Sequence, residues 1–269
     1  MWQKIIHDYL RQPYTLHTEV FSTPKDPVAT IVFVHGIGSS AAMWQPLIKK
    51  VRHNATIIAL DLVGFGRSPK PQGETYDAVF QARCIHKTLK GIRYTTPVIF
   101  VGHSLGTLIA VEYAKLYPHE VDSLVLCSPP FYMENSDQPL SIDEGLIKVY
   151  QQVIKHPKDT SRILSWATKY YFPNKGFHVD KSHVGSYIQT LQSAIINQTA
   201  LRDTKQLPQR IRFFVGKFDP LVVTANIVEV VRDNIHASIT RVAAGHEITG
   251  VYTITLARAI DAAVAELTD

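Results

Sequence analysis

Three short segments of the sequence hold residue types that together could carry out nucleophilic catalysis. The first is Gly102-His-Ser-Leu-Gly106, in which a serine stands between two glycines. The second, Val215-Gly-Lys-Phe-Asp-Pro220, contains Asp219, and the third, Ala244-Gly-His-Glu247, contains His246. A serine hydroxyl is a weak nucleophile at neutral pH, so it needs a base, and the base needs an orienting acid. The three segments supply these three groups.

The surroundings of Ser104 predict the tight strand-to-helix turn known as a nucleophile elbow. Pro97–Val101 is a short apolar run that predicts a buried strand, and Leu105–Tyr117 is apolar nearly all round, which is typical of a buried helix. A serine in the pattern G-x-S-x-G between a strand and a helix stands clear at the strand's end, and side chains at the glycine positions would clash. We therefore predict Ser104 as the nucleophile rather than part of a structural turn.

The acid and the base follow in the chain order expected for such a turn. Asp219 comes directly after the predicted strand Arg210–Val215, and His246 comes shortly after the predicted strand Ala237–Val242. Some proteins with this arrangement place the acid after the preceding strand, but that segment, Cys127-Ser-Pro-Pro130, has no carboxylate. We therefore predict Asp219 as the orienting acid and His246 as the base.

The developing oxyanion needs two backbone donors. The N–H of Leu105 follows the nucleophile, and the N–H of Ile37 follows the His35-Gly36 pair after an earlier strand, so we predict these two. His35 itself is expected to hold its loop by hydrogen bonds. His103 adjoins the nucleophile, but the elbow should direct it elsewhere, which disfavours it as the base. Substrate contacts are not fixed by the sequence, and the candidates are Gly36, His103, Phe131 and Tyr132.

Alternating strand and helix signals predict the elements that position these residues. Continuous apolar runs predict buried parallel strands at Thr30–Val34, Ala55–Leu60, Pro97–Val101 and Val121–Leu126. Segments of helical length lie between them, which indicates a mostly parallel central sheet flanked by helices. Tyr14–Phe21 is expected to form antiparallel edge strands, and Thr249–Leu267 a final amphipathic helix.

The alternation of predicted strands and helices stops after Pro130 and resumes at about residue 208. Only helices are predicted in between: Gly145–Lys155, opened by a capping box at Ser141–Glu144, then Arg162–Tyr171 and Lys181–Gln198. We therefore expect an α/β core of residues 1–130 and 208–269, with a helical cap of residues 131–207 inserted after the sixth strand. Aromatic side chains are frequent in this insertion, and they could line an apolar pocket or bury the cap against the core.

Composition excludes several other classes of protein. Charged residues are 19% of the chain, below the roughly 25% of a typical globular chain, and hydrophobic residues are 45%, which argues against disorder. No apolar run reaches the roughly 18 residues of a membrane span. The net charge is +5, but Lys and Arg are scattered, so no nucleic-acid partner is expected.

The remaining expectations rest on missing signals. The first residues lack an apolar stretch of signal-peptide length, and only two cysteines, Cys84 and Cys127, are present, so we expect a cytoplasmic protein. No metal-binding or phosphate-loop motif is found, so no metal or other cofactor is expected. The sequence leaves a monomer and a homodimer equally open.

Taken together, these segments resemble the α/β-hydrolase superfamily from about residue 28 to the end of the chain. The resemblance is carried by His35–Trp44, Asp61-Leu-Val-Gly-Phe-Gly-Arg-Ser68, the elbow, the Asp219 segment and the Gly245-His246 pair. It is closest to the capped branch, which includes esterases, carbon–carbon-bond hydrolases, cofactor-free haloperoxidases and epoxide hydrolases. The resemblance implies that Asp61, Arg67 and Ser68 are loop scaffolding.

Two positions refine what the resemblance implies. Thr107 stands where many members have a second glycine after the elbow, and we expect only a minor change in packing there. Epoxide hydrolases and haloalkane dehalogenases of this branch have aspartate at the nucleophile position, whereas this chain has Ser104. The resemblance therefore implies acyl-type chemistry rather than an alkyl-enzyme ester.

We accordingly expect a serine hydrolase that cleaves an ester-like bond of a small, apolar substrate through an acyl-serine intermediate. A carbon–carbon-bond hydrolase would use the same three residues, and only the pocket would distinguish it. Perhydrolase or haloperoxidase activity could arise as a side reaction of the acyl-serine. A non-catalytic receptor that binds a small ligand in the capped cavity is the alternative from another class.

Overall fold

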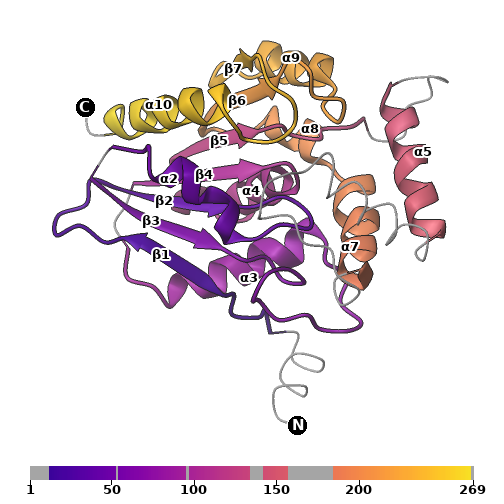
Figure 1. Ribbon diagram of the computed structural model, residues 1–269, viewed down its shortest axis with the longest axis horizontal. Helices are drawn as coiled ribbons and strands as arrows, with labels where there is room; N and C mark the ends of the chain where they lie inside the picture. The colour runs from indigo at the N-terminus through magenta and orange to yellow at the C-terminus, as the bar shows by residue number, and fades with distance from the viewer. Residues whose placement is uncertain (1–11, 53, 95–96, 134–141, 157–183, 268–269) are drawn as a thin grey trace, which may run out of the picture.

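The computed structural model describes residues 12–52, 54–94, 97–133, 142–156 and 184–267, which form a seven-stranded sheet with helices on both faces (Figure 1). The strands are β1 (Thr18–Ser22), β2 (Ala29–Val34), β3 (Ala55–Leu60), β4 (Val98–His103), β5 (Ser123–Cys127), β6 (Arg210–Gly216) and β7 (Ala237–Val242). Their order across the sheet is β1-β3-β2-β4-β5-β6-β7. Strand β1 is antiparallel to β3, and the other neighbours are parallel. The predicted mostly parallel sheet is confirmed.

Helices connect these strands, as predicted from the sequence. The helices and helical turns are η1 (Ala41–Trp44), α2 (Gln45–Ile48), α3 (Ala78–Lys90), α4 (Leu105–Leu116), η2 (Pro118–Glu120), α5 (Ile142–Lys155), α7 (Val184–Thr190), the π-helix η3 (Leu191–Ile196), α8 (Ala200–Thr204), α9 (Thr224–Asp233) and α10 (Val251–Ala265). Among these described ranges, no helix has both the length and the apolar character needed to cross a membrane.

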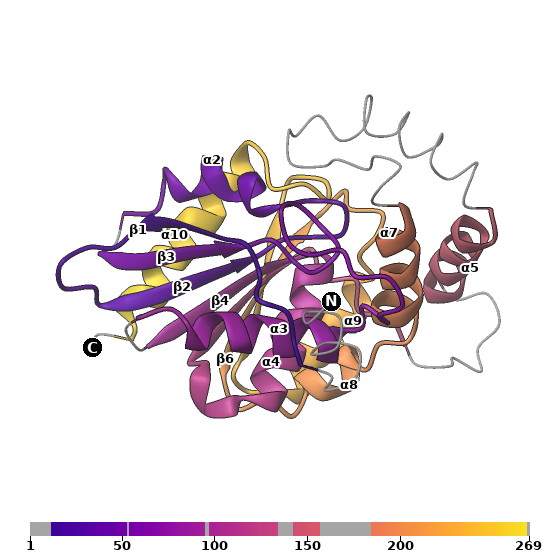
Figure 2. The ribbon, with the colours of Figure 1, turned by 90° about the horizontal axis from the view of Figure 1, so that it is seen from below.

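The strand residues alternate between two apolar cores, one on each face of the sheet. In β2, Val32 and Val34 belong to the core under α3 and α4, whereas Ile31 and Phe33 belong to the core under α2 and α10. The two pairs of helices lie on opposite sides of the sheet (Figure 2). Every residue of β2, β3, β4 and β5 is buried, so the continuous apolar runs of the sequence are explained by burial on both faces.

The antiparallel edge of the sheet is smaller than expected. The segment Tyr14–Phe21 was expected to supply edge strands in the plural, but within the described residues it forms β1 alone. The N–H of Leu16 instead donates to Thr88 Oγ1, and that of His17 donates to Ser68 Oγ, so side chains satisfy these backbone groups. Among the described residues, the helices between β5 and β6 follow the fifth strand, whereas the sequence indicated the sixth.

The stretch between β5 and β6 contributes helices and no strand in its described parts. Helices α5 and α7 lie together beyond one end of the sheet in both views (Figures 1 and 2), and both contact η3. Helix α5 confirms the helix predicted over Gly145–Lys155, and α7 with η3 falls within the one predicted over Lys181–Gln198. The predicted helix Arg162–Tyr171 and the capping residue Ser141 lie outside the described residues. The division into core and cap stays a prediction.

The turn from β4 into α4 brings backbone against backbone. A Cβ atom on Gly106 would lie 2.2 Å from the carbonyl oxygen of Val34, and one on Gly102 would lie 2.6 Å from the carbonyl oxygen of Gly106. Helix α4 is buried throughout Leu105–Ala114, so the backbone segments in contact cannot move apart to accept a larger side chain. This crowding explains why both positions are glycine, as expected for a nucleophile elbow.

We predict that Gly106→Ala destabilises the protein by about 1–3 kcal/mol or more, because the added methyl group overpacks a rigid contact. Urea unfolding followed by circular dichroism measures this change. Gly145→Ala is the control, since Gly145 lies exposed on α5 with no atom within 4 Å of the added Cβ. That substitution should stabilise the helix by about 0.5–1 kcal/mol. Equal stability of Gly106→Ala and the wild type would contradict the proposed close approach.

Candidate active site

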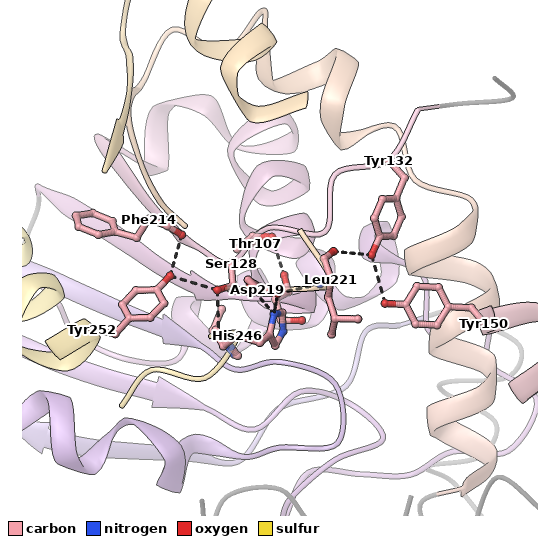
Figure 3. A network of polar contacts seen from close by, with 11 residues as sticks. Thr107, Ser128, Tyr132, Tyr150, Phe214, Asp219, Leu221, His246 and Tyr252 are labelled. Carbon is pink, nitrogen blue, oxygen red and sulfur yellow. Dashed lines mark hydrogen bonds and ion pairs between the residues drawn. The ribbon is translucent and has the colours of Figure 1, made fainter. Parts of the chain in front are cut away.

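Ser104, Asp219 and His246 all lie just beyond the carboxyl ends of parallel strands. Ser104 directly follows β4, Asp219 follows β6, and His246 follows β7. Because these ends lie along one edge of the sheet, residues far apart in the sequence come together there. Figure 3 shows Asp219 and His246 at the centre of a network of polar contacts that extends in both directions.

Ser104 is held in a backbone conformation that a residue with a side chain rarely adopts. Its φ is +51° and its ψ is −120°. The N–H of Ser104 donates to the carbonyl of Cys127 at 2.9 Å, and its carbonyl accepts the N–H and the hydroxyl of Thr107. Such strain persists only where the surrounding structure enforces it. Thr107 thus contributes a hydrogen bond to the elbow, beyond the packing change that the sequence analysis expected.

Asp219 and His246 form a buried hydrogen-bonded pair. The His246 Nδ1 atom lies 2.8 Å from Asp219 Oδ2 and 3.0 Å from Oδ1, and the Asp219 side chain has no exposed surface. An ionised carboxylate can only accept hydrogen bonds, so Nδ1 carries the proton. In the neutral ring, Nε2 therefore keeps its lone pair, which is the form that a general base requires.

Opposing effects act on the pKa of Asp219, and the hydrogen bonds prevail. Burial by itself would raise the pKa of this carboxyl group. The hydrogen bond and positive charge of His246, together with the N–H of Leu221 that donates to Oδ1 at 2.9 Å, hold the pKa below its usual value. Asp219 is therefore ionised at neutral pH, as the orienting acid must be.

The third predicted residue, Ser104, makes no hydrogen bond to this pair, but the residue before it lies against His246. The side chain of neighbouring His103 has its ring centroid 5.0 Å from that of His246. Within the described residues, neither the Ser104 hydroxyl nor His246 Nε2 makes a hydrogen bond. Catalytic hydrogen bonds of this kind commonly tighten only when substrate binds.

Two backbone N–H groups near Ser104 are available as donors. Leu105 is the first residue of α4, so its N–H has no acceptor within the helix. Ile37 follows Gly36, whose carbonyl faces the His35 ring, and the N–H of a peptide unit points opposite to its C=O. Among the described residues, the Ile37 N–H makes no hydrogen bond.

His35 holds the loop that carries Ile37, which confirms its predicted structural role. Its Nε2 accepts the N–H of Leu62 at 2.9 Å, so its proton is on Nδ1, which donates to the carbonyl of Gly36 at 2.7 Å. Burial lowers the pKa of His35, which agrees with a neutral ring. This neutral histidine fixes the direction of the Gly36–Ile37 peptide unit.

The four candidate substrate contacts have different surroundings. A Cβ on Gly36 would lie 3.2 Å from Ser104 Cβ, so the Gly36 backbone lies directly against the nucleophile. His103 is buried and its Nε2 donates to the carbonyl of His246 at 3.0 Å. Phe131 is fully buried, and its ring packs edge-on against that of Phe213 with 5.9 Å between the ring centroids. The side chains of His103 and Phe131 are thus engaged inside the protein, which favours support and core packing over substrate contact.

Tyr132 connects helix α5 to the loop of the acid. Its hydroxyl donates to the carbonyl of Leu221 at 2.9 Å and lies 3.3 Å from the hydroxyl of Tyr150 on α5 (Figure 3). Because the single proton of Tyr132 goes to the carbonyl, Tyr150 is the donor between the two phenols. A chain of contacts therefore runs from α5 through Tyr132 and Leu221 to Asp219.

Ser128 and Tyr252, which the sequence did not single out, lie on the other side of the network. The Ser128 hydroxyl lies 3.1 Å from the carbonyl oxygen of His246 and 3.3 Å from the hydroxyl of Tyr252 (Figure 3). Ser128 had been considered only as part of a segment without a carboxylate. Its place directly after β5, equivalent to that of Ser104 after β4, is a signal that the sequence does contain.

Other polar residues occupy the structural positions predicted for them. The carboxylate of Asp61 accepts the N–H groups of Ala41 and Arg67, which confirms its scaffolding role. The carboxylate of Asp122, which lies just before β5, accepts the N–H of Val98 at the start of β4, and Asp233 ends α9. Within the described ranges, no three His, Cys, Asp or Glu side chains gather as metal ligands.

Comparison with known proteins gives a consistent picture. The sequence model of the family described as alpha/beta hydrolase fold matches residues 29–176, more than half of the chain. The probable lysophospholipase BODYGUARD 2 of Arabidopsis thaliana is 35% identical over 107 residues, which are 38% of this chain and 23% of that protein. A pimeloyl-(acyl-carrier protein) methyl ester esterase of Pseudoalteromonas atlantica is 26% identical over 146 residues, 54% of this chain and 55% of that protein.

The matched region is therefore about a quarter of the length of the plant relative and about half that of the bacterial one. Among solved structures, MenH from S. aureus superimposes with a TM-score of 0.76 and 16% identity, covering 94% of this chain and 99% of the other. At this level of identity, the likeness shows a shared fold.

The lowered pKa of Asp219 makes its contribution to stability depend on pH. Because the pKa is lower in the folded than in the unfolded state, the stabilisation is fully present above the unfolded pKa of about 3.9 and is lost as pH falls through the folded pKa. The difference in free energy of unfolding between the wild type and Asp219→Asn should therefore be larger near pH 6 than near pH 3. Urea unfolding across this range measures it, and a difference that stays constant would disprove the linkage.

Proposed function

The chain belongs to the α/β-hydrolase fold family, and on this premise we propose that it is a serine hydrolase that cleaves an ester-like bond of a small, apolar substrate. The observation that carries the proposal is the buried hydrogen bond between His246 Nδ1 and Asp219, next to a serine held at positive φ. The name of the bacterial relative, a methyl ester esterase, supports an ester as the bond that is cleaved.

In the first step, Ser104 Oγ attacks the carbonyl carbon of the ester while His246 Nε2 accepts the hydroxyl proton. The N–H groups of Ile37 and Leu105 donate to the oxyanion of the tetrahedral intermediate. His246 then returns the proton to the departing alcohol, and the carbon–oxygen bond to that alcohol breaks. The acyl group remains on Ser104 as an ester.

In the second step, water replaces the alcohol. His246 accepts a proton from this water as the water attacks the acyl carbon, and it returns the proton to Ser104 Oγ as the acid product leaves. In both steps the imidazolium ion forms beside the Asp219 carboxylate, which stabilises the charge and keeps Nδ1 protonated. No metal ion or organic cofactor takes part in this scheme.

Residues 131–207 are proposed as the cap that covers this site. Tyr132 and Tyr150 connect α5 to the loop after Asp219, so the inserted segment contacts the residue, Leu221, whose N–H donates to Asp219. A cap at this place would form the substrate pocket with the core and so select the substrate. A carbon–carbon-bond hydrolase would use the same three side chains, and substrate panels rather than active-site variants distinguish the two reactions.

Labelling by a fluorophosphonate probe tests the proposed nucleophile. We expect intact-protein mass spectrometry to show one adduct on the wild type and none on Ser104→Ala. Ser123→Ala is a suitable control, because Ser123 is a buried serine at the other end of the adjacent strand β5, and it should react like the wild type. A folded wild type that forms no adduct would favour the receptor alternative, in which the cavity binds a ligand without chemistry.

Ester hydrolysis by variants then tests the roles of the three side chains. Ser104→Ala should lower kcat by about 10⁶-fold, the scale seen when the nucleophile of a serine hydrolase is removed. Asp219→Asn should lower it by up to about 10⁴-fold, because the imidazole then adopts the wrong tautomer. Circular dichroism must show that each variant is folded. Turnover near the wild-type rate in either folded variant would refute the assignment.

A further inference from the structure

The end of β5 has a serine at positive φ, as the predicted nucleophile elbow on the neighbouring strand does. His103 and Cys127 are partners in the parallel pairing of β4 with β5, so the next residues, Ser104 and Ser128, occupy equivalent places. Ser104 has φ of +51° and Ser128 has φ of +49°. The N–H of Ser104 donates to the last residue of β5 at 2.9 Å, and that of Ser128 donates to Phe214 of β6 at 2.8 Å. Two adjacent strands are therefore each followed by a serine in the strained positive-φ region.

The two serines differ in what their hydroxyl groups can reach. Ser128 has no exposed surface, so its hydroxyl does not contact substrate. It lies instead 3.1 Å from the carbonyl oxygen of His246 and 3.3 Å from the hydroxyl of Tyr252. Tyr252 donates its own proton to the carbonyl of Phe214 at 2.8 Å, so its oxygen can only accept from Ser128. The single proton of Ser128 goes to the nearer acceptor, the carbonyl of His246, and the contact with Tyr252 is at most the longer branch of a shared hydrogen bond.

A second donor reaches the same carbonyl from β4. His103 Nε2 lies 3.0 Å from the oxygen of His246, and because a carbonyl only accepts, Nε2 carries the proton. The carbonyl of His246 is therefore bound by one group from the end of β4 and one from the end of β5. Much of the loop around it is exposed, including Ala243, Gly245, Thr249 and Gly250. These two bonds thus anchor an otherwise exposed loop to the sheet.

We propose that Ser128 is a positioning residue, which holds the backbone of His246 so that its ring stays aligned between Asp219 and Ser104. The proposal rests on the function proposed above. A glycine would adopt a φ of +49° without strain, whereas serine does so at a cost. The hydroxyl group is the feature that serine has and glycine lacks, and here it binds the carbonyl of the base.

Paired substitutions separate the hydroxyl group from the strained backbone. Ser128→Gly and Ser128→Ala both remove the hydroxyl, but only alanine keeps the strain, so Ser128→Gly should unfold at the higher urea concentration. Both variants should lower kcat for ester hydrolysis by about three- to tenfold, the effect of one hydrogen bond, with KM unchanged. Ser123→Ala is the matched control, since its buried hydroxyl donates to the carbonyl of Arg210 at the opposite end of β5. It should leave kcat at the wild-type value.

Hydrogen exchange gives a readout that does not need activity. Peptides that contain residues 243–250 should exchange faster in Ser128→Gly than in the wild type, while peptides from β4 and β6 keep their rates. Wild-type exchange in this loop, or wild-type kcat, in folded Ser128→Gly would overturn the proposal. A wild type without hydrolysis or fluorophosphonate adduct would refute the proposed function instead, and exchange in the loop would still decide whether Ser128 anchors it.

Discussion

The hydrogen bond between Asp219 and His246 is the interaction on which the rest of the site depends. It joins the loops after β6 and β7, it fixes the proton on Nδ1, and it leaves Nε2 as an acceptor. A buried carboxylate is costly unless it is paired and hydrogen-bonded, and here His246 and the N–H of Leu221 supply those bonds. The pair is thus both a condition for burying Asp219 and the source of a base in the required tautomer.

Neutral hydrogen-bonding groups surround this pair and fix its geometry. His35 and His103 are both buried, and burial lowers the pKa of each. Each donates one ring proton to a backbone carbonyl, that of Gly36 or that of His246. A second charged imidazole at either place would oppose the imidazolium that the proposed mechanism forms on His246. Burial therefore allows histidines to act as rigid connectors close to the reacting base without competing with it.

The fold and the three candidate catalytic side chains could be read from the sequence because their signals are local. Glycines at 102 and 106 mark a turn that only glycine permits, and continuous apolar runs mark strands buried on both faces. Residues whose role depends on distant partners gave no such signal. Ser128 meets the carbonyl of His246, and Tyr132 meets that of Leu221, contacts that exist only once the chain has folded. Phe131 was a candidate for the pocket, because burial against Phe213 is not visible in a run of aromatic residues.

In the roles proposed for them, Ser104 and Ser128 put the same positive φ to two different purposes. Both turns form because parallel strands end at the same edge, where each N–H finds an acceptor on the next strand. What separates them is the direction in which the chain continues. After Ser104 the chain enters α4, and the N–H of Leu105, the first residue of that helix, has no acceptor within it; a helix N-terminus favours a developing negative charge. After Ser128 the chain continues into two prolines, and the enclosed hydroxyl faces polar groups of the protein, the carbonyl of His246 and the hydroxyl of Tyr252.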